Sequence, residues 1–150
     1  MRCQTRDNVS IVCACLFPDF ELTNPPRSNR SAYGLTTYAY LFSGNFSNIT
    51  PRYWLGGMHG SDIPLVFGTH YQFRDNSTEL EWETSYAIEA FWISFAANPS
   101  AEPRNHLGQA WPKYTAASHQ IVVFGNATGL GASYVASGDC KQVQWSMLAI

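Results

Sequence analysis

The sequence has few of the features that mark membrane or nucleic-acid-binding proteins. No apolar run reaches the roughly 18–20 residues that a transmembrane helix requires. The longest candidate, VSIVCACLF at residues 9–17, is half that length and contains a serine. The 9 lysines and arginines stand against 11 acidic residues, and a net charge of −2 attracts neither nucleic acid nor an anionic membrane. We therefore expect no membrane span and no nucleic-acid partner.

The chain also lacks a signal-peptide pattern at its polar start, MRCQTRDN. Its 150 residues, 45% of them hydrophobic, suit one domain with a core. Asn-x-Ser/Thr sequons exceed the number expected by chance and occur at Asn8, Asn29, Asn45, Asn48, Asn76 and Asn126. Of these, we predict glycans at Asn45, Asn48, Asn76 and Asn126, as in an extracellular protein whose export signal is not in this sequence. The alternative is a surface that is simply rich in Ser, Thr and Asn.

The order of predicted elements indicates an α/β fold with a mostly parallel sheet. Residues 1–33 are expected to be irregular. LTTYAYLFSG at residues 35–44 and IVVF at residues 121–124 read as strands, and DIPLVFG at residues 62–68 suits a short buried element or one helical turn. VQWSML at residues 143–148 is expected to begin a last helix.

One long helix is predicted between these strands. Thr78 can cap its start and Glu81, three residues later, completes a capping box, while Asn98-Pro99 ends it. Apolar residues recur along one face at helical spacing, at Leu80, Ala87, Ile88, Phe91, Trp92 and Phe95.

A histidine between glycines is the candidate functional feature, in LGGMHGSDIPLVFG at residues 55–68. An imidazole can take and return a proton near neutral pH, and a catalytic base needs to reach two partners, which favours a loop. Gly56, Gly57 and Gly60 permit sharp turns and a close approach beside His59. The alternative is a surface histidine in a flexible glycine loop.

Four blocks, in order and with their spacing kept, resemble the C-terminal part of one family: YAYLFSGNFSN, GGMHGSDIPLVFG, EAFWISFAANPS and WPKY. This is the type-B carboxylesterase family, which includes cholinesterases and fungal esterases and lipases. NFSNITPR is most similar to the filamentous-fungal branch. The match covers residues 34–115 and continues more weakly to residue 150. It implies the C-terminal portion of an α/β-hydrolase fold, incomplete on its own.

By this resemblance His59 is the triad histidine, which accepts a proton from a serine. Asp62 matches an acidic position that helps hold the pocket in relatives and is not the triad acid. The alternative for Asp62 is a cap or turn residue that bonds local amides. Trp54, Leu55 and Met58 match pocket-lining positions, with plain core packing as their alternative.

The rest of that catalytic machinery is missing from the sequence. No G-x-S-x-G nucleophile elbow occurs, since GASYV at residues 131–135 fails at its last position, and no HGG-type oxyanion loop occurs. The family's triad acid lies on an earlier strand. Without a nucleophile or oxyanion donors, this polypeptide alone is expected to hydrolyse nothing.

The resemblance also pairs two of the four cysteines. Cys3 and Cys140 correspond to a disulfide of cholinesterase-like relatives, and closing so long a loop is worth up to about 4–5 kcal/mol in the loop-entropy model. Four free thiols are the alternative. We expect no cofactor, and no zinc, because Cys13-x-Cys15 is too tight a pair and has no partner pair.

Residues 9–26 fit the family worst. Val9-Ser10, Leu22-Thr23 and Pro26-Arg27 can be encoded by the donor, branch-point and acceptor sequences of a short fungal intron. Two interpretations stay open, a retained intron translated in frame and a variable insert. Residues 34–150 would then form the hydrolase part.

The sequence suggests three possible functions. The first is a C-terminal segment of a secreted serine carboxylesterase or lipase that cleaves small-molecule carboxylic esters through an acyl-enzyme when complete. The second is a non-catalytic, esterase-like glycoprotein that acts as a binding module. The third is an unrelated small secreted binding domain, which would require the four ordered blocks to match the family by coincidence. His59 favours the first, because a purely adhesive relative does not need it.

Overall fold

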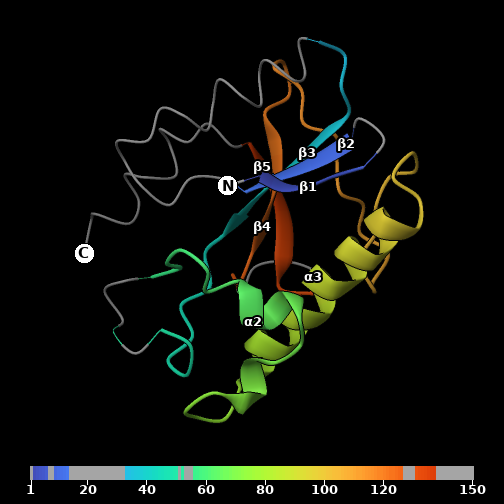
Figure 1. The fold of residues 1–150 in the computed structure, drawn as a ribbon. Helices are drawn as coiled ribbons and strands as arrows, with labels where there is room; N and C mark the ends of the chain where they lie inside the picture. The colour runs from blue at the N-terminus through green and yellow to red at the C-terminus, as the bar shows by residue number, and fades with distance from the viewer. Residues whose placement is uncertain are drawn as a thin grey trace.

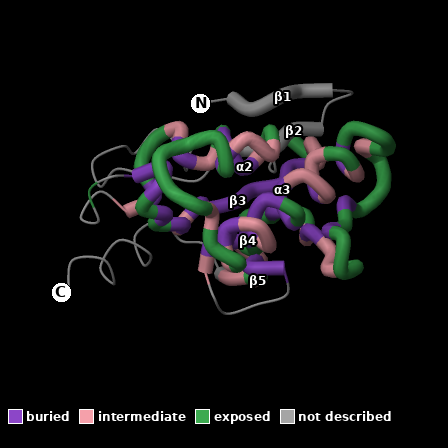
Figure 2. The backbone as a smooth tube through the Cα atoms, turned by 90° about the horizontal axis from the view of Figure 1, so that it is seen from below, coloured by how far each residue is buried: buried purple, intermediate pink, exposed green. Residues whose placement is uncertain are grey.

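A computed structural model describes residues 33–50, 52, 56–126 and 131–136, together with the backbone of residues 2–6, 9–13 and 137. Five strands form one sheet in chain order, β1 (Arg2–Arg6), β2 (Val9–Cys13), β3 (Thr37–Phe42), β4 (Gln120–Phe124) and β5 (Ser133–Ser137). β3 lies at the centre of this sheet, between β2 and β4, as Figures 1 and 2 show. The pairs β2–β3 and β3–β4 are parallel, whereas β1 and β5 are antiparallel to their neighbours. The sheet is therefore mixed rather than mostly parallel.

The prediction of an irregular N-terminal segment was wrong for residues 2–6 and 9–13, which form β1 and β2. The stretch VSIVC is rich in β-branched residues but too short to show a period of its own. It becomes a strand by pairing with β3, from Ser10 opposite Thr37 to Cys13 opposite Tyr40. β5 was also missed, because it pairs with β4 across residues 125–132, a longer connection than the roughly two to five residues of a common hairpin loop. The predicted last helix lies outside the described residues, as do residues 14–26 of the proposed insert.

The long helix is confirmed as α3 (Glu79–Ala97), which runs across one face of the sheet (Figure 1). The Thr78 hydroxyl accepts a hydrogen bond from the Glu81 amide at 3.2 Å, and the Glu81 carboxylate accepts one from the Thr78 amide at 3.3 Å. Asn98 ends the helix. Between β3 and α3 lie two short elements, α2 (Ile63–Val66) and the 3-10 turn η2 (His70–Gln72).

The core forms where the apolar face of α3 meets alternate side chains of β3 and β4. Its helical part is the predicted one, with Ala87, Ile88, Phe91 and Phe95 buried and Leu80 and Trp92 partly buried against them. Alternate residues of the strands face the helix, and those between them form a second cluster on the other face of the sheet, as the period of two in a strand requires. No helix of the described residues is both long and apolar enough to cross a lipid bilayer.

Candidate functional site

The carboxyl ends of the parallel strands β3 and β4 are joined by hydrogen bonds. Phe42 at the end of β3 lies opposite Phe124 at the end of β4. The next residue, Ser43, donates from both its amide and its hydroxyl to the Phe124 carbonyl oxygen, each at 2.9 Å. Ligand sites of open α/β sheets form at this end of the strands.

The loop that carries the predicted histidine rests on this end of β3. We call residues 56–62 the histidine loop. Gly57 is buried, and a Cβ atom on it would lie 2.8 Å from the Phe42 carbonyl oxygen. A larger residue would push the loop away from the strand, so a close approach of the kind predicted is present at Gly57.

His59 occupies the corner of a tight turn within that loop. The turn runs from Met58 to Ser61, and the Met58 carbonyl oxygen accepts hydrogen bonds from the Ser61 amide at 3.0 Å and the Ser61 hydroxyl at 2.6 Å. Gly60 has a φ of +81°, which the third position of a type II turn requires. His59 is exposed, and no described side chain hydrogen-bonds to its ring. The imidazole is therefore held on a short turn and is not packed into the core.

Asp62 joins the histidine loop to the sheet. Its Oδ2 accepts a hydrogen bond from the Tyr40 hydroxyl at 2.8 Å, and its backbone carbonyl accepts one from the Val66 amide at 3.0 Å. The carboxylate makes no capping bond to the start of α2. The side chain thus bonds to β3 and not to local amides, which was the alternative open from the sequence.

The other predicted site residues fall partly outside the described residues. Met58 is 38% exposed, so core packing does not account for it. Trp54, Leu55 and Cys140 are not among the described residues, and Cys3 lies in β1, of which only the backbone is described. The predicted pocket lining and disulfide remain predictions.

The four predicted glycan sites differ sharply in exposure. Asn45 and Asn76 are exposed and Asn126 is half-buried, but Asn48 is only 2% exposed. Its Nδ2 donates hydrogen bonds to Glu81 Oε1 at 2.8 Å and to the His70 carbonyl at 3.2 Å. An N-linked glycan is attached through this same nitrogen. The prediction of a glycan at Asn48 is therefore corrected, because its amide belongs to the protein interior.

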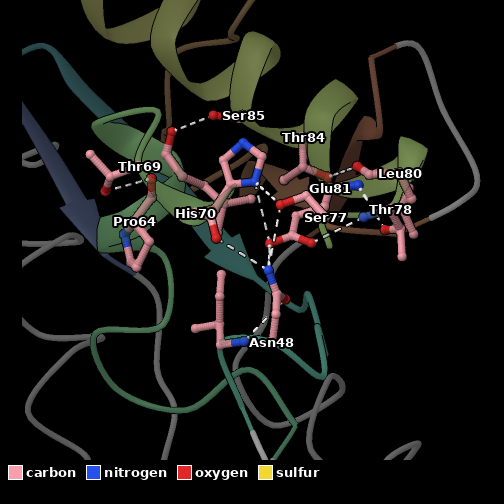
Figure 3. Close-up of polar contacts among 12 residues, drawn as sticks. Asn48, Pro64, Thr69, His70, Ser77, Thr78, Leu80, Glu81, Thr84 and Ser85 are labelled. Carbon is pink, nitrogen blue, oxygen red and sulfur yellow. Dashed lines mark hydrogen bonds and ion pairs between the residues drawn. The ribbon is translucent and has the colours of Figure 1, made fainter. Parts of the chain in front are cut away.

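A buried polar cluster surrounds that amide, made of Asn48, His70, Ser77 and Glu81 (Figure 3). His70 and Glu81 are fully buried. The Ser77 hydroxyl lies 2.7 Å from His70 Nδ1, and Glu81 Oε1 lies 3.4 Å from the same nitrogen. The Trp82 ring packs edge-on against the imidazole, with 4.4 Å between ring centroids. The cluster ties the loop after β3 to η2 and to the start of α3.

The cluster contains a serine, a histidine and a carboxylate, but its geometry is not that of a catalytic triad. A triad histidine uses one nitrogen for the serine and the other for the acid. Here Ser77 and Glu81 face the same nitrogen, and Nε2 is buried without a hydrogen-bond partner among the described groups. Burial lowers the pKa of His70, and the nearby Glu81 and Glu89 only partly offset this. The cluster therefore supports the fold.

Sequence reasoning missed His70 as a buried residue. The capping box placed Glu81 at the helix start, but the partners of its carboxylate could not be read locally, since Asn48 lies 33 positions earlier. The only local signal is a histidine between an apolar run and a capping box. Among the described residues, no group of three His, Cys, Asp or Glu side chains is placed to hold a metal ion.

Comparison with known proteins identifies the family. The model of the carboxylesterase family matches residues 13–139. The chain is 40% identical over 108 residues to the chlorogenic acid esterase of Aspergillus niger, covering 64% of this chain and 21% of that protein. It is 45% identical over 71 residues to secreted lipase 5 of Gibberella zeae, covering 47% and 13%. It is 40% identical over 87 residues to the acetylcholinesterase of Bungarus fasciatus, covering 57% and 14%.

The chain thus spans about a fifth or less of the length of these curated relatives. The family match nevertheless extends over most of its own 150 residues, including β3, the histidine loop, α3 and β4. The chain belongs to the carboxylesterase family.

Proposed function

We propose that this chain forms the C-terminal part of a serine carboxylesterase or lipase and supplies its general base, His59. The observation that carries the proposal is the position of His59. It is exposed on a glycine-containing turn at the carboxyl end of the parallel strands β3 and β4. A base in this place can face a nucleophile that a neighbouring part of the same sheet presents.

The proposed reaction proceeds through an acyl-enzyme. His59 removes the proton of a serine hydroxyl as its oxygen attacks the ester carbonyl carbon, and the imidazolium then protonates the leaving alcohol. Water repeats the sequence with the same base and releases the acid. The serine, the triad acid and the oxyanion donors would come from sequence that precedes this segment in relatives. Asp62 supports His59 by fixing the loop to Tyr40 and takes no proton itself.

The proposed substrate is a small-molecule carboxylic ester, and the proposed location is extracellular. Matched relatives are named as an esterase and a secreted lipase. The excess of sequons agrees with export.

A chimera tests the proposal. In the Aspergillus niger esterase, the 108-residue matching region is replaced by that of this chain, so that the host supplies the serine and acid. We expect hydrolysis of p-nitrophenyl acetate, reduced by several orders of magnitude in His59→Ala. His106→Ala is the matched control, since His106 is also exposed but pairs with Glu83 at 3.4 Å, and it should stay near the parent activity.

The same chimera distinguishes a segment of an esterase from a non-catalytic binding module. Such a protein would fold in the chimera and yet give no serine-dependent turnover. A folded chimera whose turnover is unchanged in His59→Ala would refute the assignment of the base.

A further inference from the structure

An exposed phenylalanine precedes one of the sequons by three residues. Phe73 is 46% exposed, and no described ring packs against it. The chain bends over residues 73–75 between η2 and α3, and the sequon Asn76-Ser77-Thr78 follows directly. An aromatic ring left in water loses the free energy that burial of its apolar surface would give. A group attached to this bend could cover it.

Asn76 is an accessible glycan attachment site among the sequons of the described residues. The Asn48 amide is buried and hydrogen-bonded to Glu81. Asn45 and Asn126 each engage other residues of the chain. Asn76 is exposed, and its side chain makes no hydrogen bond to a described residue. Its Nδ2 can therefore carry a substituent without any loss of native hydrogen bonding.

We propose that Asn76 carries an N-linked glycan whose first N-acetylglucosamine packs against the ring of Phe73. The face of this sugar that bears C–H bonds and its acetyl methyl group are apolar and match an aromatic ring, while its hydroxyls stay in water. The inference rests on the export proposed above. It does not depend on His59 or on catalysis.

In the proposed modification, a lipid-linked oligosaccharyl diphosphate is the donor of the sugar. The bond between sugar C1 and the diphosphate oxygen breaks, and a bond between C1 and Asn76 Nδ2 forms. The amide gives up one proton, and the lipid diphosphate leaves with the electron pair of the broken bond. The sequon hydroxyl is that of Thr78, which in the folded chain caps α3.

The glycan would stabilise the loop that leads into α3. The residue after Asn76 is Ser77, whose hydroxyl lies 2.7 Å from His70 Nδ1 in the buried polar cluster. A sugar held on Phe73 restricts the bend on the solvent side of that contact. Unfolding exposes both the ring and the sugar, so the glycosylated form should melt at a higher temperature.

The test uses the full chain, exported from yeast with an added signal peptide. Glycopeptide mass spectrometry should find Asn76 occupied. Endoglycosidase H then leaves one N-acetylglucosamine, and thermal midpoints are compared for the wild type, Phe73→Ala, Asn76→Gln and the double variant. We expect the single sugar to raise the midpoint by about 3 °C with Phe73 present and by nothing measurable in Phe73→Ala.

Two controls make the comparison specific. Phe67→Ala removes a phenylalanine that is 73% exposed but precedes no sequon, and the gain from the sugar should persist there. Asn76→Gln is used in place of a Thr78 variant because Thr78 also caps α3. A measurement that needs no variant is the nuclear Overhauser effect between the acetyl methyl group and the Phe73 ring protons, which should be present.

An unoccupied Asn76 would overturn the proposal. So would an occupied Asn76 whose stabilisation is the same in Phe73→Ala, or whose acetyl group shows no Overhauser contact with Phe73. None of these results bears on the esterase proposal, which the chimera tests separately.

Discussion

The Tyr40 hydroxyl donates a 2.8 Å hydrogen bond to Oδ2 of Asp62 and so joins the middle of β3 to the end of the histidine loop. The Tyr40 ring is buried, and its neighbours include the rings of Trp92 and Trp111 with centroids at 5.2 and 6.1 Å. A loop that holds a catalytic base must keep its geometry, because a misplacement of about 1 Å can cost 10²-fold in rate. This hydrogen bond is one anchor that keeps it.

Tyr40→Phe is expected to loosen that anchor. Loss of the hydroxyl leaves the half-buried Asp62 carboxylate without this donor and should lower the free energy of unfolding by about 1 kcal/mol. Urea denaturation of the full chain measures it. Tyr134→Phe is the control, since this half-buried tyrosine makes no hydroxyl hydrogen bond to a described residue. Equal losses in the two variants would contradict the anchoring role.

Acid should weaken the fold through His70. Its folded pKa is lowered from 6.5, first by burial, so between the two pKa values the unfolded chain binds more protons than the folded one. Stability is therefore full above pH 6.5 and falls as the pH drops, until the folded pKa is reached and the loss levels off. Urea midpoints between pH 7.5 and 4.5 measure this for the wild type and His70→Gln. If the two curves run parallel, His70 is not the titrating group.

Asn48→Asp is expected to be severely destabilising. The substitution places a second carboxylate where Nδ2 now donates to Glu81 Oε1 at 2.8 Å, inside the buried polar cluster. Removing the donor and adding a like charge should cost about 3 kcal/mol at pH 7.

Asn76→Asp is the matched control for that variant, because Asn76 is exposed and lies outside the buried polar cluster, in the short segment between η2 and α3. A change within about 0.5 kcal/mol is expected for it. If Asn48→Asp were equally mild, the hydrogen bond to Glu81 would have little effect on stability.

The chain by itself should not hydrolyse esters. It contains no G-x-S-x-G elbow and no HGG-type loop, so a base has no serine to activate. The rate with p-nitrophenyl acetate should equal that of His59→Ala, and a fluorophosphonate should label no serine. Turnover that the fluorophosphonate blocks would show that a nucleophile is present in these residues after all.

Local rules predicted those parts of the fold whose signals lie close together in the sequence. The capping box of Thr78 and Glu81 and the stop at Asn98 fixed the ends of α3. The glycine pattern around His59 predicted a tight turn and a close approach, and both are present at Gly60 and Gly57. Each of these features depends on backbone geometry within a few residues.

The features that were missed depend on distant partners. β2 becomes a strand by pairing with β1 and β3. The buried Glu81 carboxylate accepts a hydrogen bond from Asn48, which lies 33 positions earlier in the chain. The Asp62 carboxylate bonds to Tyr40 rather than to a local amide, a choice set by the packing of the loop on the sheet. The sequon at Asn48 is a further example. The motif identifies a possible attachment site for a glycan, but it does not show that the asparagine is buried.

The role of His59 is tested most directly by the rate at which a fluorophosphonate labels the serine of the chimera, because this step requires the serine proton to be removed but no product release. We expect rapid labelling in the parent chimera and in His106→Ala, and labelling slowed by several orders of magnitude in His59→Ala. Labelling at the parent rate in a folded His59→Ala chimera would contradict that role.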